Sequence, residues 1–279
     1  MSTAFASTIR AVSTVLFVSG ATPERFEKAL ASDADLVCID LEDSVPNEAK
    51  AQAREAALQA IHNPRAAIRI NGLATRAGIE DLLALSGLQK GAIAFIPMVE
   101  SADELRIAAA ILGDTFALVP LIETPRGLRK AFEIASAPAV AAMMFGGGDL
   151  AASLGVELAW EPLAGARSAF LLACAEARVP AIDVPFVGLD DAAGLADECK
   201  RAAAAGFQAK AAIHPAQLAT LSAAFRPDAA LVAEAEAARA AFDAANGAAT
   251  RFNGRMLEEP LMRRYDRILA QAKRMASDA

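Results

Sequence analysis

The sequence predicts an α/β protein with the (β/α)8 barrel fold. Short apolar runs alternate with segments of helical periodicity over most of the 279 residues. The runs are apolar throughout, which is typical of parallel strands buried on both faces. An open doubly wound sheet is the alternative, but Ser19-Gly20-Ala21-Thr22 lacks the glycine-rich dinucleotide fingerprint. The expected strands are Thr14–Val18, Leu36–Leu41, Ala67–Ile70, Ile93–Val99, Phe116–Ile122, Val140–Phe145, Ala181–Pro185 and Ala209–Ile213.

The segments between these strands have recognisable helix starts. Thr22-Pro23 and Thr124-Pro125 place proline at the first helical position, where its missing N–H costs nothing. Ser101 followed by Glu104 fits a capping box. Further starts are expected at Pro46-Asn47-Glu48 and Pro215-Ala216-Gln217.

The pattern changes after the eighth helix, which is expected at about 215–225. Pro227-Asp228 opens an alanine-rich helix to about Ala245, and a last helix is expected from Pro260. We therefore expect a barrel domain over residues 1–226 and a C-terminal helical extension over residues 227–279.

Composition and charge exclude several classes of protein. The net charge is −7 and the basic residues are dispersed among acids, which argues against a nucleic-acid partner. Cys38, Cys174 and Cys199 have no paired spacing, so neither disulfides nor a zinc site is expected. No apolar run approaches the length of a membrane span. Cleavage of the apolar run after Arg10 as a signal peptide would delete the first strand, so a cytoplasmic location is expected.

Two carboxylates follow neighbouring strands of the expected barrel. Glu123 ends the fifth strand, and Asp149 follows the sixth after a glycine run that includes Gly147 and Gly148. Active sites of barrels lie at the carboxyl ends of the strands. Mg²⁺ takes one or two carboxylates together with waters and substrate oxygens, whereas zinc would want histidine or cysteine. We expect Glu123 and Asp149 to bind Mg²⁺ and the glycines to allow close backbone approach to a ligand.

Other charged residues also lie at strand ends. Arg69 leaves an apolar strand, and its guanidinium matches a substrate carboxylate bidentately; an internal ion pair with Glu42 or Asp43 is the alternative. His214 ends the eighth strand, where a structural hydrogen bond and a part in chemistry both stay open. The remaining strand-end residues are Asp40, Asn71, Glu100 and Asp183.

Seven ordered blocks along nearly the whole chain resemble the HpcH/HpaI aldolase and citrate lyase β-subunit superfamily, specifically its citrate lyase β-like branch. The blocks are Leu16 to Gly20 with Pro23 to Phe26, Asp40 to Val45, Arg69 to Leu73, Pro120 to Gly127, Phe145 to Leu150, Pro180 to Asp183, and Gly206-Phe207 with Lys210 and Ile213 to Pro215.

The resemblance implies a Mg²⁺-dependent lyase that cleaves or forms a carbon–carbon bond. Its substrate would be a 3-hydroxyacyl-CoA such as citramalyl-CoA, malyl-CoA or citryl-CoA, and the products a 2-oxo acid and acetyl-CoA or a related acyl-CoA. Glu123 and Asp149 take the metal positions and Arg69 the substrate-carboxylate position. Glu42 and Asp43 fall in the acidic block that orients water near the metal. A homotrimer or hexamer is also implied, with the C-terminal extension in contact with a neighbouring subunit.

Two positions depart from the family pattern. Met98 stands where citrate lyase β-like proteins often carry lysine. Glu258 replaces an aspartate that reaches a neighbouring subunit's site in malyl-CoA and citramalyl-CoA lyases. It keeps a carboxylate, longer by one methylene, for an acid or base role; the alternative is an exposed acid at a helix start.

Two alternative functions stay open, and the first of them would use the same metal site. One is a class II pyruvate aldolase that acts on hydroxy-oxo acids without CoA. The other is a carrier-dependent subunit of the citrate lyase β type, which acts only within a complex. Acyl-CoA thioesters tested beside free hydroxy acids separate the first, and turnover of a free thioester by the purified chain excludes the second.

Overall fold

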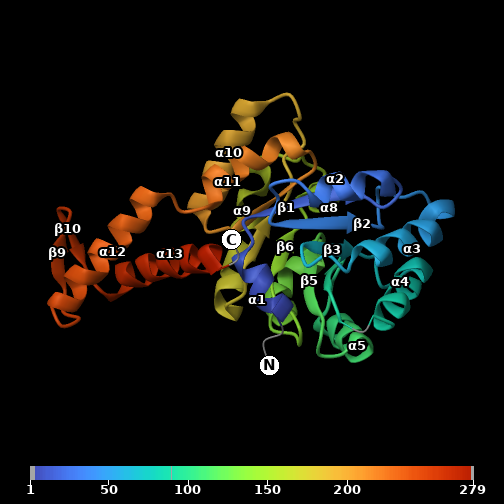
Figure 1. The fold of residues 1–279 in the computed structure, drawn as a ribbon, viewed down its shortest axis with the longest axis horizontal. Helices are drawn as coiled ribbons and strands as arrows, with labels where there is room; N and C mark the ends of the chain where they lie inside the picture. The colour runs from blue at the N-terminus through green and yellow to red at the C-terminus, as the bar shows by residue number, and fades with distance from the viewer. Residues whose placement is uncertain (1–3, 89, 278–279) are drawn as a thin grey trace. The chain divides into compact units, whose positions relative to one another are not determined.

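The computed structural model describes residues 4–88 and 90–277. Eight parallel strands form a closed barrel in chain order, with β1 paired to both β2 and β8 (Figure 1). This confirms the predicted fold. The strands are β1 (Thr14–Ser19), β2 (Leu36–Asp40), β3 (Ala66–Arg69), β4 (Ile93–Ile96), β5 (Ala117–Ile122), β6 (Met143–Phe145), β7 (Ala181–Asp183) and β8 (Ala209–Ala212).

Helices follow the strands and form the outer layer of the barrel (Figure 1). The predicted starts at Ser101 and Thr124 are present, because each hydroxyl accepts a hydrogen bond from the backbone N–H three residues later. The helices are α1 (Ala4–Ala11), η1 (Pro23–Arg25), α2 (Phe26–Leu30), η2 (Asn47–Ala49), α3 (Lys50–Ala60), α4 (Arg76–Ser86), α5 (Ala102–Leu112), α6 (Pro125–Arg129), α7 (Ala131–Ala135), α8 (Gly147–Leu154), α9 (Trp160–Ala177), α10 (Ala192–Ala205), η3 (Pro215–Gln217) and α11 (Leu218–Phe225).

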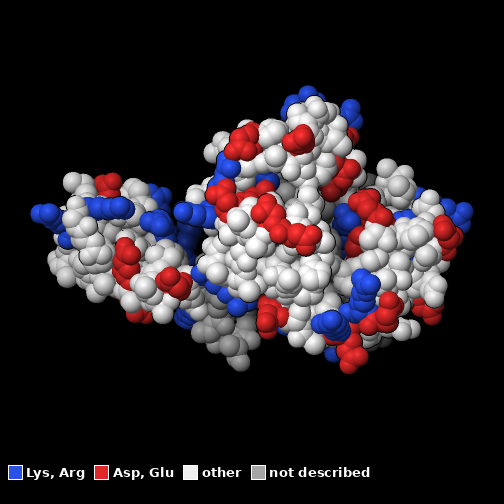
Figure 2. All heavy atoms as spheres, turned by 90° about the horizontal axis from the view of Figure 1, so that it is seen from above, with Lys and Arg blue, Asp and Glu red and all other residues white. Residues whose placement is uncertain are grey.

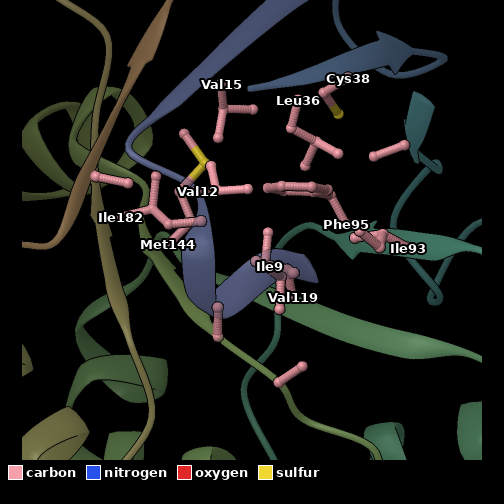
Figure 3. Close-up of a cluster of buried hydrophobic side chains, with 14 of the residues drawn as sticks. Ile9, Val12, Val15, Leu36, Cys38, Ile93, Phe95, Val119, Met144 and Ile182 are labelled. Carbon is pink, nitrogen blue, oxygen red and sulfur yellow. The ribbon is translucent and has the colours of Figure 1, made fainter. Parts of the chain in front are cut away.

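Helix α1, which the sequence pattern did not predict, packs against the beginnings of the strands. Figure 3 shows Ile9 and Val12 directed at a buried cluster that includes Val15, Leu36 and Ile93. The last three side chains belong to the first residues of β1, β2 and β4. The amino-terminal end of the barrel is therefore filled with apolar side chains, and the carboxyl end is left for function.

Several strands are shorter than predicted, and two of them differ by three residues. The fourth was expected to reach Val99 but stops at Ile96, because Pro97 has no N–H and Met98 has a left-handed φ of 57°. The sixth was expected from Val140, which makes only an isolated bridge to Leu118 before regular pairing begins at Met143.

The chain divides into two compact units, one up to Ser222 and one from Ala223. The second unit contains α12 (Ala229–Ala244), the hairpin strands β9 (Thr250–Phe252) and β10 (Arg255–Leu257), and α13 (Glu259–Ser277). The hairpin was not predicted, although its turn residues Asn253 and Gly254 both have positive φ, as a type I′ turn requires. The core of the second unit is formed by Ala235, Ala238, Phe242, Leu257, Met262 and Tyr265.

Acidic and basic side chains are interspersed on the face that Figure 2 shows. This distribution agrees with the dispersed charges expected from the sequence. Within the described part of the chain, no helix combines the length and apolar character that crossing a membrane requires.

Candidate active site

A pocket of about 1020 Å³ opens at the carboxyl ends of the strands. Its lining comes from the ends of β1, β2, β3 and β5 and from the segments that follow β6, β7 and β8, all within the first unit. Leu16, Leu121 and Met144 contribute apolar surface, whereas charged side chains come from the strand ends and from η1, α2 and α8. A largely apolar cavity with a few polar groups is the usual form of a small-molecule site.

Glu123 is held rigidly at the end of β5. It is 4% exposed, and its Oε2 accepts a hydrogen bond of 2.7 Å from the backbone N–H of Met98. A Cβ at Gly146 would lie 2.0 Å from Cγ of Glu123, so glycine is required for the carboxylate to occupy this place. Burial raises the pKa of Glu123 to about 7, and the charges of Asp149 and Asp43 add to the rise. Its Oε1 remains for a cation.

Asp149 lies in the first turn of α8 rather than on a strand. It is exposed and lines the same pocket as Glu123, whose pKa its charge raises. A divalent cation between them would remove this repulsion. Over residues 4–88 and 90–277, no group of three or more histidine, cysteine, aspartate or glutamate side chains could hold a metal. Two hard carboxylates with open positions fit Mg²⁺, which completes its shell with water and substrate oxygens.

The start of α8 brings backbone N–H groups to the pocket. Gly148 lines it, and a Cβ there would meet nothing within 4 Å. A Cβ at Gly147 would lie 3.1 Å from both Leu158 and Val184, so glycine lets the helix begin close to the end of β7. The amino end of a helix attracts anions through its free N–H groups and its dipole.

Arg69 is tied to the acidic block after β2. Its Nε and Nη2 donate to the two carboxylate oxygens of Asp40 at 2.6 and 2.8 Å, because Asp40 and Arg69 are opposite each other in the β2–β3 register. Nη2 is also 3.6 Å from Asp43, and the guanidinium lies 5.5 Å from the Phe17 ring centre. Burial opposes the charge of Arg69, but Asp40 raises its pKa. The internal ion pair expected as an alternative is therefore present, with Asp40 as its main partner.

Glu42 and Asp43 differ in their surroundings. Oε2 of Glu42 lies 2.8 Å from Nη1 of Arg69, yet this buried oxygen has no hydrogen bond of suitable direction. Burial raises the pKa of Glu42 to about 8, although Arg69 lowers it. The short distance to Arg69 favours a charged Glu42, whereas the raised pKa favours the protonated acid near neutral pH. We favour the protonated acid, because burial outweighs a poorly directed contact. Asp43 has a side chain that is 71% exposed and lines the pocket.

Two further strand-end residues have structural partners. His214 lines the pocket, and its Nδ1 accepts a hydrogen bond of 3.2 Å from the N–H of Ala216, which caps η3. Asp183 is fully buried between Lys210 at 2.6 Å and Arg167 at 3.2 Å. The structural role left open for His214 is observed, and Asp183 belongs to a buried ion-pair network.

Glu258 belongs to the second unit. It is exposed, and its backbone carbonyl accepts hydrogen bonds of 2.9 Å from the N–H groups of Leu261 and Met262 at the start of α13. This geometry corresponds to the helix-start alternative, and a catalytic role for Glu258 stays a prediction.

Some residues at the site were missed by sequence reasoning. Asp40 was noted as a strand-end residue but not as the partner of Arg69, because the register that pairs the two is not readable from one strand. Arg25 and Lys28 also line the pocket, from η1 and α2. Their spacing of three residues after a strand end was the available signal.

A closed parallel (β/α)8 barrel carries its active site at the carboxyl ends of its strands, which is where the pocket with Glu123 and Asp149 lies, so fold and pocket together define a barrel enzyme. The model of the HpcH/HpaI aldolase/citrate lyase family matches residues 13–215. The chain belongs to this family, so the predicted resemblance and the assignment to the lyases are confirmed.

Two curated relatives align with nearly the whole chain. A citrate lyase subunit beta-like protein of Mycobacterium tuberculosis is 35% identical over 271 residues, which cover 94% of this chain and 96% of that protein. An L-malyl-CoA/beta-methylmalyl-CoA lyase of Cereibacter sphaeroides is 32% identical over 302 aligned positions, covering 94% of this chain and 95% of the lyase.

Solved structures agree with this assignment. CitE of Mycobacterium tuberculosis in complex with magnesium, acetoacetate and coenzyme A is 34% identical with a TM-score of 0.81, covering 95% of this chain and 99% of that one. A citrate lyase beta subunit of the same organism, with oxaloacetate and magnesium, is 36% identical with a TM-score of 0.71, covering 79% and 100%. Magnesium in both structures agrees with the predicted Mg²⁺ dependence.

Proposed function

We propose that this chain is a Mg²⁺-dependent lyase that cleaves or forms 3-hydroxyacyl-CoA thioesters, giving a 2-oxo acid and acetyl-CoA or a related acyl-CoA. The observation that carries this proposal is the placement of Glu123 and Asp149 in one pocket, beside the amino end of α8. Together these groups offer a cation site and an anion site to neighbouring oxygens of one small molecule.

Glu123 and Asp149 would hold Mg²⁺, which supplies Lewis-acid stabilisation to the oxygen that gains charge. The oxo-acid carboxylate would lie between Arg69 and the N–H groups of Gly147 and Gly148. Arg69 cannot turn freely toward a ligand, because Asp40 fixes two of its nitrogens. Its charge and position are therefore set before the substrate binds, which lowers the entropy cost of orientation.

Proton transfer is assigned to the acidic residues. In the cleavage direction a base takes the hydroxyl proton, and the departing thioester enolate needs a proton at carbon. Asp43, exposed in the pocket, would hold a water for this exchange, and Glu42, whose pKa is raised to about 8, would keep a proton near neutral pH. Glu258 of a neighbouring subunit would supply a further carboxylate. That assignment is supported by the family resemblance at this position alone.

The CoA portion would use the basic side of the pocket. Arg25 and Lys28 are exposed and line the cavity. Both side chains suit phosphate groups, because arginine offers a planar fork of donors that matches phosphate oxygens and lysine a compact positive charge. The complex of a relative with coenzyme A supports this part of the proposal.

The charges of the pocket favour an oxo acid with one carboxylate. The relatives were solved with both acetoacetate and oxaloacetate, so they leave this choice open. Of the described lining residues that carry a positive charge, Arg25 and Lys28 are assigned above to the CoA portion, and Arg69 already contacts Asp40 and Asp43. Met98, where lysine is common, supplies no charge. A second carboxylate would meet like charges, so malyl-CoA or citramalyl-CoA is favoured over citryl-CoA.

An assay panel tests the function. Malyl-, methylmalyl-, citramalyl- and citryl-CoA are incubated with the purified chain and Mg²⁺, and the released oxo acid is identified. We expect glyoxylate or pyruvate from the one-carboxylate substrates, and loss of activity with EDTA, Glu123→Gln or Asp149→Asn. Full Mg²⁺-dependent activity in either variant would refute the metal assignment. Turnover of free hydroxy-oxo acids alone would show a CoA-free aldolase, and turnover only with an acyl carrier partner would show a dependent subunit.

A further inference from the structure

Lys50, the first residue of α3, lies against the loop that carries Glu42 and Asp43. Its Nζ donates to the backbone carbonyls of Leu41 and Glu42, both at 2.9 Å, and to Oδ1 of Asn71 at 2.5 Å. An ammonium group has three N–H donors. All three are thus matched by acceptors, and two of these belong to the backbone of the acidic block.

The third acceptor is fixed to the body of the barrel. Asn71 and Asp81 are 4% and 1% exposed. The backbone N–H and the Nδ2 of Asn71 donate to one oxygen of Asp81 at 2.9 and 2.7 Å, and Arg54 donates to its other oxygen at 2.5 Å. A buried and fully bonded network of this kind is rigid. Lys50 therefore connects the loop to an anchor made by β3 and α4.

The loop is held from its other side by Asp40. The carboxylate of Asp40 accepts from the N–H of Glu42 at 2.9 Å and from the N–H of Ser44 at 3.3 Å, while also binding Arg69. The N–H groups of this turn are thus tied to Asp40 and its carbonyls to Lys50. The direction in which Glu42 and Asp43 leave the backbone depends on both contacts.

We propose that Lys50 is a positioning residue, which sets the orientation of Glu42 and Asp43 toward Arg69 and the pocket by clamping the carbonyls of Leu41 and Glu42. Its effect on turnover rests on the proposed lyase function, and its effect on the loop does not. Without the ammonium, the two carbonyls lose a charged donor and the turn gains alternative conformations. A displacement of about 1 Å in a reacting group costs on the order of a hundredfold in rate.

The experiment compares Lys50→Met with Lys200→Met, a substitution of an exposed lysine on α10. Hydrogen exchange is followed for the peptide that contains residues 41–45, and thermal unfolding shows that each variant is folded. We expect exchange in this peptide to rise about tenfold or more in Lys50→Met, because the open state of the turn is more populated. Lys200→Met should leave it unchanged.

The steady-state readout separates positioning from a general structural role. We expect kcat of Lys50→Met to fall about 10- to 100-fold, with KM for the CoA thioester close to wild type. Because Lys50 acts through the acidic block, adding Lys50→Met to an Asp43→Asn background should cost much less than in the wild type. An equal loss in both backgrounds would overturn the proposal.

Two further outcomes are decisive. If Lys50→Met does not fold, Lys50→Arg takes its place. Arginine keeps the positive charge but has a planar fork instead of three donors on one nitrogen, so we expect raised exchange in residues 41–45 and a lower kcat. Wild-type values of both in Lys50→Arg would overturn the proposal. If the wild-type protein turns over no thioester, the proposed function fails. The positioning role of Lys50 is then tested by hydrogen exchange in residues 41–45 alone. Unchanged exchange in folded Lys50→Met would contradict that role.

Discussion

At the residue scale, the proposed cation site depends on how closely the backbone approaches Glu123. One carboxylate oxygen is taken by the N–H of Met98, a residue with a left-handed φ of 57°. The absent side chain of Gly146 leaves room for the rest. Strain of this kind in a non-glycine residue costs on the order of 1–3 kcal/mol and persists where surrounding structure enforces it.

Replacing Gly146 tests this close approach. In Gly146→Ala the new methyl would overlap Cγ of Glu123, so we expect the carboxylate to be displaced and both Mg²⁺ affinity and kcat to fall at least about tenfold. Titration calorimetry with Mg²⁺ measures the first effect. Gly165→Ala in α9 is the matched control, because its Cβ meets nothing within 4 Å and should stabilise the helix by about 1 kcal/mol. Unchanged Mg²⁺ affinity in Gly146→Ala would contradict the site.

At the scale of elements, the acidic and basic side chains of the pocket come from different segments of the chain. The acids follow β2 and β5 and open α8, whereas Arg25 and Lys28 come from η1 and α2 after β1. Under the proposed function, the acids would serve the metal-chelating oxo acid, and Arg25 and Lys28, the basic side, would serve the phosphates.

Removing the basic side should weaken binding and spare the chemistry. For Arg25→Ala with Lys28→Ala, we expect KM for the CoA thioester to rise about tenfold or more, with kcat nearly unchanged and a weaker dependence of KM on salt. Lys130→Ala, an exposed lysine outside the pocket lining, is the control. A fall in kcat at constant KM would instead place these residues among the reacting groups.

At the scale of the whole molecule, the buried acids tie stability to pH. Burial raises the pKa of Glu123 from 4.5 to about 7 and that of Glu42 from 4.5 to about 8. From pH 4.5 up to these raised pKa values, the folded, metal-free protein thus binds more protons than the unfolded chain. The stability from these groups is complete below pH 4.5 and is lost as the pH rises through 7 and 8.

The substitution Glu123→Gln isolates one of these groups. In EDTA, urea unfolding at pH 8 should show the variant more stable than wild type by up to about 3 kcal/mol, whereas at pH 5 the two should be nearly equal. Mg²⁺ should stabilise the wild type at pH 8 and have little effect on the variant. A constant difference between the two proteins over this pH range would refute the buried-acid assignment of Glu123.

A contribution of Glu258 to a neighbouring subunit's site predicts complementation. Glu258→Ala and Glu123→Gln should each be nearly inactive alone. After unfolding and refolding together, mixed oligomers contain sites with Glu123 from one chain and Glu258 from another, and part of the activity should return. Light scattering of the mixture establishes the oligomeric state. An inactive mixture of well-formed oligomers would show that Glu258 does not act between subunits, and glutamate at this position would then serve only to begin α13.

Much of the fold could be predicted because it is written in local pattern. Apolar runs too short for helices, helix caps such as Ser101 and Thr124, and prolines at helix starts all act within a few residues. The fourth strand ends earlier than predicted, because the left-handed φ of Met98 ends its pairing. The closing helix α1 was missed, because its apolar face is explained only by the strand beginnings it covers.

The sequence by itself determined the barrel, the paired acids Glu123 and Asp149, and the family, since each depends on residue type and order along the chain. Tertiary structure decided which charges meet. The pairing of Asp40 with Arg69 and the clamp by Lys50 join residues from different elements. So does the enclosure of Glu123 by Met98 and Gly146. These contacts follow from strand register and burial, which set distances and pKa values that no single segment contains.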